Sequence, residues 1–523
     1  MRTPRLLVMW LLVAWLDATA ANSPSNPYEG PVVTTPANRI DELVFHRLKR
    51  LNLEPANRCS DAVFVRRAYL DIIGTLPTGH EAREFILDSH PDKRAALIDR
   101  LLARDEFADY WAMKWSDLLR VKAEFPINLW PNAAQAYHRW IRASIRENKP
   151  YDQFARELLT SSGSNFRVGP VNFYRAMQNR EPEGIAQTVA LTLMGERAEK
   201  WPPEKLEGMA AFFSQIGYKS TSEWKEEIVF FDPNHATNGL AKAAAFPDGR
   251  TVELAANQDP REVFADWLMD GKNPWFARNI VNRVWSWLLG RGIIHEPDDI
   301  RPDNPPSNPE LLAYLEKELI ASKYDLRHLY RLILNSQTYQ LSSVPRSDKP
   351  EAEANFAHYP LRRLEAEVLI DALNQITGTT EKYSSAIPEP FTFIPADHRS
   401  IALPDGSISS PFLEMFGRPP RDTGLESERN HRPTAAQSLH LLNSSHIQRK
   451  LEQSRMIQYQ TGSKKTPREI AVGIYLGVLS RFPTEAELKT VEAYFNSGKV
   501  REREAVVDLA WALVNSPEFL YRH

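Results

Sequence analysis

The sequence predicts a mainly α protein, with two helical domains joined by a small β-containing connector. Apolar residues recur at helical spacing along most of the 523-residue chain. The 38 prolines mark many helix boundaries, because proline is tolerated in the first turn of a helix and breaks it further in. A chain of this length exceeds one ordinary core, which favours two large domains.

Residues 1–20 have the pattern of a secretory signal peptide. An arginine-bearing start precedes the apolar run Leu6–Leu16, and Ala18 and Ala20 supply the small residues of a cleavage site. The apolar run is too short to span a bilayer, and no cysteine follows it to carry a lipid anchor. We therefore expect an exported chain, periplasmic or extracellular and not membrane-spanning, that begins near Ala21.

The first helical domain is expected over residues 39–225, after a flexible lead at residues 21–38 that is rich in Pro, Asn and Ser. Ser60 or Asp61 can cap its second helix, and Gly74 ends that helix. The predicted helices are Arg39–Asn52, Ala62–Ile73, Glu81–Asp88, two within Asp92–Val121, Ala133–Arg146, Tyr151–Thr160, Glu183–Met194 and Pro203–Phe213.

The connector is expected over residues 226–259. Ile228–Phe231 and Phe246–Leu254 are strand-like apolar runs. Asp248 and Gly249 lie inside the second run and form a hairpin turn signal, because this dipeptide accepts the positive φ angles of tight turns.

The second helical domain is expected over residues 260–523. A long irregular loop, Ser384–Arg432, interrupts it, and loops of this length in compact domains are usually functional or disordered. The predicted helices are Arg261–Met269, one within Asn273–Gly292, Pro309–Ser322, Asp325–Leu334, Arg363–Thr377, Thr434–Gln453, Thr466–Leu479, Thr484–Phe495 and Arg503–Asn515.

The helix within Asn273–Gly292 carries many apolar residues and should be buried. Asn273 can cap it, and Gly290 stops it. Its polar residues Asn282 and Arg283 then need partners, since buried polar groups are normally paired. A structural ion pair in the core is one interpretation, and a functional site is the other.

The candidate site combines this helix with the long loop. Arg421, Glu428 and Arg429 on the loop could line a cleft with Asn282 and Arg283, and arginine clusters bind carboxylates, sulfates or phosphates. In the alternative interpretation Glu428 pairs with Arg283 or a neighbour and pins the loop.

Arg66, Arg67 and Asp71 form a similar group in the first domain. Arg67 and Asp71 lie one turn apart, which predicts an ion pair on the surface of a helix.

Metal and cofactor sites are not expected. The single cysteine, Cys59, excludes an intramolecular disulfide, a thiolate metal cluster and a CxxCH haem attachment, and we expect a buried, inert thiol. His440 and His446 would lie well apart around a single helix, unlike the paired histidines of a zinc helix. A net charge of −3 gives no field to recruit nucleic acid.

Several motifs of the second half carry a family resemblance. They are Val281–Trp285 (VNRVW), Gly290–Ile294 (GRGII), Asn304–Leu312 (NPPSNPELL), Leu332–Ser343, Arg362–Glu367 (RRLEAE), Leu479–Leu488 and Trp511–His523. They resemble domain of unknown function 1553, the C-terminal half of large secreted planctomycete-type proteins. Arg66–Thr78, Asn148–Thr160 and Gly208–Phe213 resemble its usual N-terminal partner, domain of unknown function 1549.

The chain departs from this family at two cysteine features. The resemblance implies a CxxCH segment before Trp201, which this chain lacks, and a Cys-x-Cys-Glu-Arg within Gly424–Arg429, of which it keeps Glu428 and Arg429 but neither cysteine. The family's association with cytochrome-like domains and sulfatase-like genes implies envelope redox chemistry or polysaccharide metabolism.

Three functions follow from the residues and the resemblance together. The first is a non-catalytic binding or assembly component with an envelope protein or an anionic glycan as partner. The second is a polysaccharide-acting enzyme that uses Glu428 in an interdomain cleft. The third is a redox component that has lost its haem or metal motif.

Overall fold

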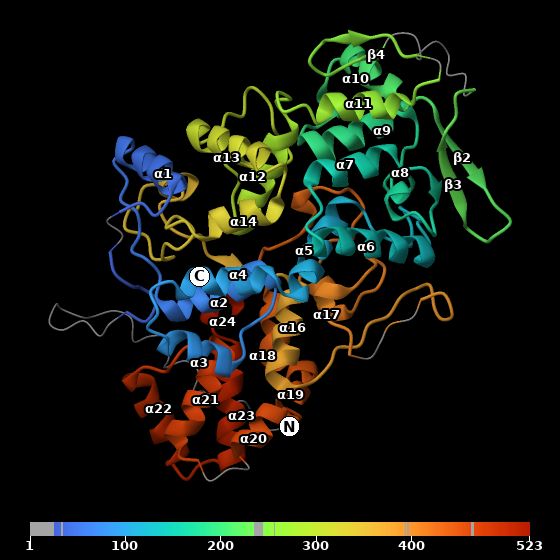
Figure 1. Cartoon of the computed structure of the whole chain (residues 1–523). Helices are drawn as coiled ribbons and strands as arrows, with labels where there is room; N and C mark the ends of the chain where they lie inside the picture. Colours follow the sequence, from blue (N-terminus) through green and yellow to red (C-terminus); the bar gives the residue numbers. More distant parts are fainter. Residues whose placement is uncertain are drawn as a thin grey trace.

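The computed structural model describes residues 26–32, 35–234, 244–255, 257–392, 394, 397–461 and 465–523. The protein is mainly α, as predicted, with small antiparallel sheets among its helices (Figure 1). The expected signal peptide at residues 1–20 lies outside the described residues. No helix in the described part of the chain is long and apolar enough to cross a membrane.

Ten α-helices form the described part of the first half, and their ends follow the capping residues of the sequence. Asn38 and Asp41 form a reciprocal capping box at the first helix, and Gly74 ends the second with φ +60°. The helices are α1 (Arg39–Arg50), α2 (Asp61–Ile73), α3 (Gly79–Leu87), α4 (Lys93–Leu102), α5 (Asp105–Leu118), α6 (Pro131–Arg146), α7 (Tyr151–Thr160), α8 (Asn172–Arg175), α9 (Pro182–Val189) and α10 (Pro203–Ala210).

The β structure is wider than the predicted connector. β3 (Glu227–Phe231) pairs with β2 (Ile216–Ser220) and with the short β1 (Gly163–Ser164), so the first strands lie within residues expected to be helical domain. The predicted hairpin is present: β4 (Ala244–Ala245) pairs with β5 (Thr251–Val252), and Gly249 in its turn has φ +89°.

The longer helices of the second half match the predicted helices, and the differences concern the shorter ones. The prediction of one helix over Thr434–Gln453 is wrong, because Ser444 leaves helical geometry and caps a new helix with its side chain. The helices are α11 (Pro260–Leu268), α12 (Phe276–Leu289), α13 (Pro309–Ala321), α14 (Leu326–Leu334), α15 (Glu351–Ala354), α16 (Ala366–Thr377), α17 (Pro411–Met415), α18 (Ala435–Asn443), α19 (Ser445–Glu452), α20 (Arg455–Thr461), α21 (Pro467–Leu479), α22 (Glu485–Phe495), α23 (Glu502–Val514) and α24 (Pro517–Leu520).

The two halves of the sequence interleave in space. Figure 1 shows the red C-terminal helices directly beneath the blue α2 and α3. Buried Arg66 on α2 donates hydrogen bonds of 2.9 Å to the carbonyl oxygens of Val478 and Phe519. The last strand, β7 (Tyr521–Arg522), pairs with β6 (Arg362–Arg363). One continuous apolar core therefore draws side chains from both halves.

The described part of the lead at residues 21–38 contacts the folded chain. Glu29 forms a β-bridge with Cys59, and the Tyr28 hydroxyl donates to Glu518 at 3.1 Å. These contacts bring the two ends of the described chain together.

The long loop Ser384–Arg432 contains α17 and is otherwise largely irregular. Its buried Asp405 accepts a hydrogen bond of 2.8 Å from the backbone N–H of Ala123, and Gly406 donates to the carbonyl oxygen of Val121. The loop therefore lies against the segment after α5 and brings its arginines to that helix.

Candidate functional site

Asn282 lies in the middle of α12 and binds the turn that follows the helix. Its Nδ2 donates to the carbonyl oxygen of Ile294 at 2.9 Å, and its Oδ1 accepts from the Ile294 N–H at 2.8 Å. A Cβ atom at Gly292 would lie 2.1 Å from that carbonyl oxygen, so the turn requires glycine there. Asn282 is thus a buried structural residue.

Arg283, only 1% exposed, joins α12 to the following loop and to the long loop. Its Nη2 lies 2.8 Å from Asp298 Oδ1, and its Nη1 lies 3.7 Å from Glu426 Oε2. Asp298 Oδ2 also accepts from the Glu426 N–H at 2.6 Å. Burial disfavours the charge of Arg283, but the carboxylates of Asp298 and Glu426 outweigh it and raise the pKa of Arg283.

Arg421 and Arg429 meet at Asp117 on α5. The Nε atom of Arg421 lies 2.9 Å from Asp117 Oδ1, and Arg429 Nη2 lies 2.7 Å from Asp117 Oδ2. Arg421 also has φ +62°, a left-handed backbone that costs a non-glycine residue free energy. The two predicted loop arginines therefore share one carboxylate.

Glu367 on α16 is the second carboxylate that binds Arg429. Arg429 Nη1 lies 2.6 Å from Glu367 Oε2, and Nη2 lies 3.0 Å from Oε1, a bidentate pair. Burial alone would raise the pKa of Glu367, yet Arg429 and Arg418 outweigh it and lower this pKa to about 2. Both partners are buried, so the pair is shielded from water.

Glu365 is the centre of a neighbouring group of charges. Lys114 Nζ lies 2.7 Å from Glu365 Oε1, and Arg522 also donates to this carboxylate. Burial would raise the pKa of Glu365, but Arg522 and Lys114 outweigh it and hold the pKa well below its usual value. Arg522 further pairs with Asp71 at 3.2 Å.

Glu428 pins its loop, as the second interpretation predicts, but through backbone N–H groups and not through Arg283. Its Oε1 accepts from the N–H of Asp422 at 2.9 Å and of Thr423 at 3.3 Å, which pins the long loop. The expected partner Arg283 instead pairs with Glu426, two residues earlier. Arg429, the arginine next to Glu428 in the sequence, pairs with Glu367 and Asp117. The short helical turn at Glu426–Glu428 separates the two carboxylates.

The five candidate residues lie in or beside two ion groups, which we together call the buried ion network. Arg283 pairs with Asp298 and Glu426, whereas Arg421 and Arg429 pair with Asp117, and Arg429 also with Glu367. Asn282 lies beside Arg283 on α12, and Glu428 fixes the loop that carries Arg421 and Arg429. A cavity of about 10 Å³ adjoins the network, which is room for one water molecule at most. It is lined by Lys114, Asp117, Leu118, Pro419, Leu425, Glu426 and Arg429.

The network residues that the sequence analysis missed are mainly carboxylates. Glu365 and Glu367 lie at the start of the apolar helix α16, within the RRLEAE motif, and Asp117 lies in the apolar helix α5. The argument that a buried Arg283 needs partners applies equally to these carboxylates. The sequence thus allowed a prediction that these carboxylates need partners, but it did not identify the partner of each one.

The Arg67–Asp71 prediction is wrong. Both residues are buried, and Asp71 pairs with Arg362 at 3.1 Å and with Arg522. Arg67 donates instead to backbone carbonyl oxygens, including that of Tyr339 at 2.6 Å. The C-terminal segment covers this face of α2, so it is not a surface.

The histidine prediction also needs correction. His440 and His446 lie on different helices, α18 and α19, and His440 Nε2 lies 3.2 Å from His446 Nδ1. His446 Nε2 lies 2.9 Å from Glu381 Oε2, which gives a Glu–His–His chain of hydrogen bonds. Among the described residues, no group of three or more His, Cys, Asp and Glu side chains is arranged to hold a metal ion.

Cys59 is buried, as expected, and the guanidinium of Arg94 lies 3.7 Å from its sulfur. The segment where the resemblance implies CxxCH ends in a turn that leads into α10 at Pro203. Glu196 holds this turn, because its carboxylate accepts from the indoles of Trp201 at 2.8 Å and Trp275 at 2.5 Å.

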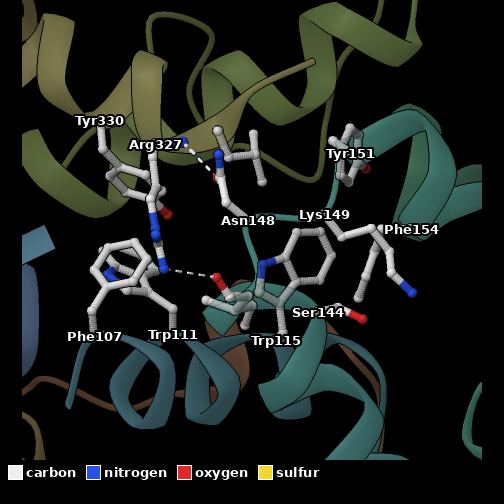
Figure 2. Close-up of a pocket in the computed structure, with 12 residues that line it drawn as sticks. Phe107, Trp111, Trp115, Ser144, Asn148, Lys149, Tyr151, Phe154, Arg327 and Tyr330 are labelled. Atoms are coloured by element: carbon white, nitrogen blue, oxygen red, sulfur yellow. Dashed lines mark hydrogen bonds between the residues drawn. The ribbon is translucent and has the colours of Figure 1, made fainter. Parts of the chain in front are cut away.

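A second cavity, of about 30 Å³, is lined largely by aromatic rings (Figure 2). Trp111, Trp115 and Tyr330 lie among its walls, and Arg327 crosses one side to donate to the carbonyl oxygen of Ile145 at 3.3 Å. Its volume corresponds to about one water molecule. The cavity is therefore a packing gap between α5, α7 and α14.

Two family models match the chain. Residues 39–201 match the one described as a protein of unknown function (DUF1549), and residues 260–495 match the one described as a protein of unknown function (DUF1553). No curated protein and no solved structure matches the chain. The matches follow the order that the motifs predicted, with Gly208–Phe213 and Trp511–His523 outside the matched ranges. The chain thus belongs to the proteins that join an N-terminal DUF1549 domain to a C-terminal DUF1553 domain.

Proposed function

We propose that this protein is an exported, non-catalytic binding or assembly component of the cell envelope. The observation that carries the proposal is the pairing of Arg429: its terminal nitrogens bind the carboxylates of buried Glu367 and partly buried Asp117. An arginine held in this way stabilises the fold and has little capacity left for a ligand. The buried ion network therefore supports a structural role for the residues that were predicted to line a cleft.

The competing function is a polysaccharide-acting enzyme that uses Glu428 as an acid or base. Such a group must reach the glycosidic oxygen or a water molecule, usually opposite a second carboxylate. Glu428 instead accepts two backbone N–H groups of its own loop. Its carboxylate therefore supports the loop, and we rank binding or assembly above catalysis.

The experiment compares Glu428→Gln with Glu426→Gln. Glutamine keeps one oxygen acceptor, so Glu428→Gln should change the free energy of unfolding by less than about 1 kcal/mol. Glu426→Gln should cost more, about 1–3 kcal/mol, because Arg283 loses a charged partner. Both values come from denaturant unfolding monitored by circular dichroism.

The same proteins are then incubated with neutral, uronic-acid and sulfated polysaccharides, and released reducing ends are measured. The proposal expects no turnover by the wild-type protein. Turnover that disappears in a stably folded Glu428→Gln variant would make the protein an enzyme.

Export is a separate prediction, based on the sequence pattern of residues 1–20, and it has its own test. The mature protein should begin near Ala21 and be recovered from the periplasm or the medium. An intact Met1 terminus in the cytosol would contradict the envelope assignment.

A further inference from the structure

Aromatic side chains from three distant segments gather on one edge of the molecule. We call Phe125, Trp130, Trp224, Lys225 and Phe391 the aromatic platform. Phe125 and Trp130 lie on the segment between α5 and α6, Trp224 and Lys225 on the turn between β2 and β3, and Phe391 on the long loop. The β2–β3 hairpin extends to the right edge of Figure 1.

Ring contacts connect the three segments. The ring centroids of Trp130 and Phe391 lie 5.2 Å apart, and Lys225 Nζ lies 6.0 Å from the Trp130 centroid and 5.3 Å from the Trp224 centroid. The ring contacts therefore join Phe391, Trp130, Lys225 and Trp224 in that order. Phe125 lies on the loop that the Trp130 N–H closes by donating to the carbonyl oxygen of Ala123 at 3.1 Å.

Three of these rings are unusually exposed for their size, whereas Trp130 is partly buried. The exposed fraction is 79% for Phe125, 69% for Trp224 and 47% for Phe391. Apolar rings grouped on a surface commonly mark an interaction site, because exposing them to water is unfavourable. The grouping of rings from three segments makes this edge a candidate surface.

The backbone of the platform is strained at its two central residues. Trp130 has φ +71° and Lys225 has φ +64°, in the left-handed region that side-chain-bearing residues rarely adopt. Each such residue costs about 1–3 kcal/mol, and this strain clusters at functional sites. The strain fixes the direction in which both side chains leave the chain.

Polar contacts hold the loops that carry the platform. Glu226, next to Lys225, accepts from the hydroxyls of Ser164 at 2.5 Å and Thr221 at 2.7 Å. Glu124, next to Phe125, accepts from the backbone N–H of Ala386 at 3.0 Å and so joins this segment to the long loop. The rings are thus presented by constrained turns, which lowers the entropy cost of binding.

The surrounding charges discriminate between possible ligands. Lys225 and Arg167 are exposed cations, while Glu223 and Glu389 are exposed acids beside Trp224 and Phe391. Proteins that bind anionic membranes or single-stranded nucleic acid do so through surfaces on which basic residues predominate. A sugar ring instead has an apolar C–H face that packs on an aromatic ring, and hydroxyls that bond to groups of either charge.

We propose that the aromatic platform binds a pyranose polysaccharide by stacking sugar rings on Trp224 and Phe125, with Trp130 and Phe391 beside them. This inference rests on the proposed binding function and specifies its ligand class. The platform residues differ from those of the buried ion network, although Phe391 shares the long loop with Arg421 and Arg429. The network stabilises the core, and the platform carries recognition.

The test uses the full chain and affinity electrophoresis in gels that contain a neutral β-glucan, a galactomannan, a polyuronate or a sulfated galactan. The wild-type protein should be retarded by at least one of these. Trp224→Ala and Phe125→Ala should each weaken binding about tenfold, the loss typical of an aromatic anchor. Their unfolding midpoints should match that of the wild type.

The matched control is Tyr459→Ala. Tyr459 is 68% exposed and has Lys465 Nζ 4.1 Å from its ring centroid, but it lies on α20 outside the platform. This variant should be retarded as strongly as the wild type. Equal loss of retardation in Tyr459→Ala would overturn a site-specific role for the platform.

The remaining outcomes separate this inference from the proposed function. Retardation that persists in Trp224→Ala and Phe125→Ala would overturn the platform and leave a binding function elsewhere. Cleavage of the retarding polysaccharide would overturn the non-catalytic function and leave the platform as a substrate contact. Absence of retardation in every gel, or Trp224-dependent binding to phosphatidylglycerol vesicles alone, would overturn the polysaccharide assignment.

Discussion

Arg429 donates two hydrogen bonds to the carboxylate of Glu367, at 2.6 Å from Nη1 and 3.0 Å from Nη2. The first residue belongs to the long loop and the second to α16, and both are buried. The contact therefore fixes an otherwise irregular segment to the core, and it is the clearest target for substitution.

Arg429→Met should destabilise the protein by about 3–5 kcal/mol, because Glu367 would be left buried without its bidentate partner. The measurement is the free energy of unfolding in urea. Arg39→Ala is the control: Arg39 pairs with Glu42 at 2.5 Å on the exposed face of α1 and should contribute less than about 1 kcal/mol. Equal effects of the two changes would contradict the burial of the Arg429 pair.

Stability should fall in acid between about pH 4.5 and pH 2. The pKa of Glu367 is lowered on folding from 4.5 to about 2, so its contribution is present above the unfolded value and is lost as pH falls through the folded one. Glu367→Gln should flatten this part of the stability–pH curve. Unfolding midpoints measured from pH 7 to pH 2 give the comparison, and parallel curves for both proteins would contradict the assignment.

Trp285→Ala should cost about 3–5 kcal/mol, as large-to-small changes in a core do. Trp285 is fully buried on α12, and its ring centroid lies 5.1 Å from that of Phe356. Trp224→Ala is the matched control, since the same substitution at an exposed position should change stability by less than about 0.5 kcal/mol. An unchanged midpoint for Trp285→Ala would show that α12 is peripheral to the fold.

The protein should be colourless when purified from a host that matures c-type cytochromes. Covalent c-type haem needs two thiols and an adjacent histidine, and the single thiol of this chain, Cys59, is buried. Absorbance near the Soret wavelength and metal analysis for iron and zinc give the measurement. A haem spectrum with stoichiometric iron would restore the redox function to first place.

Local patterns in the sequence determined most of the helices. Thr466 and Thr484 start α21 and α22 through capping boxes that the sequence displays, and Gly290 ends α12 with φ +73°. The Asp248–Gly249 turn was also predictable from the sequence, because its conformation depends on the residues in the turn itself. These features need only neighbouring residues, so the sequence suffices.

The predictions from the sequence were wrong where the local signals were weak. The break at Ser444 divides a continuous helical pattern, since serine is compatible with a helix and is also a strong cap. β2 was missed because its pairing with β3 comes from a distant partner and its own pattern is short.

Tertiary structure decided the partners of the buried charges at the candidate site. The sequence required a partner for Arg283, but Asp298 and Glu426 became its partners only when two loops met α12. Asp71 likewise pairs with Arg522, 451 residues further along the chain, although Arg67 lies one helical turn away. Ion pairing depends on distance and burial in three dimensions, and a sequence contains charges without their positions.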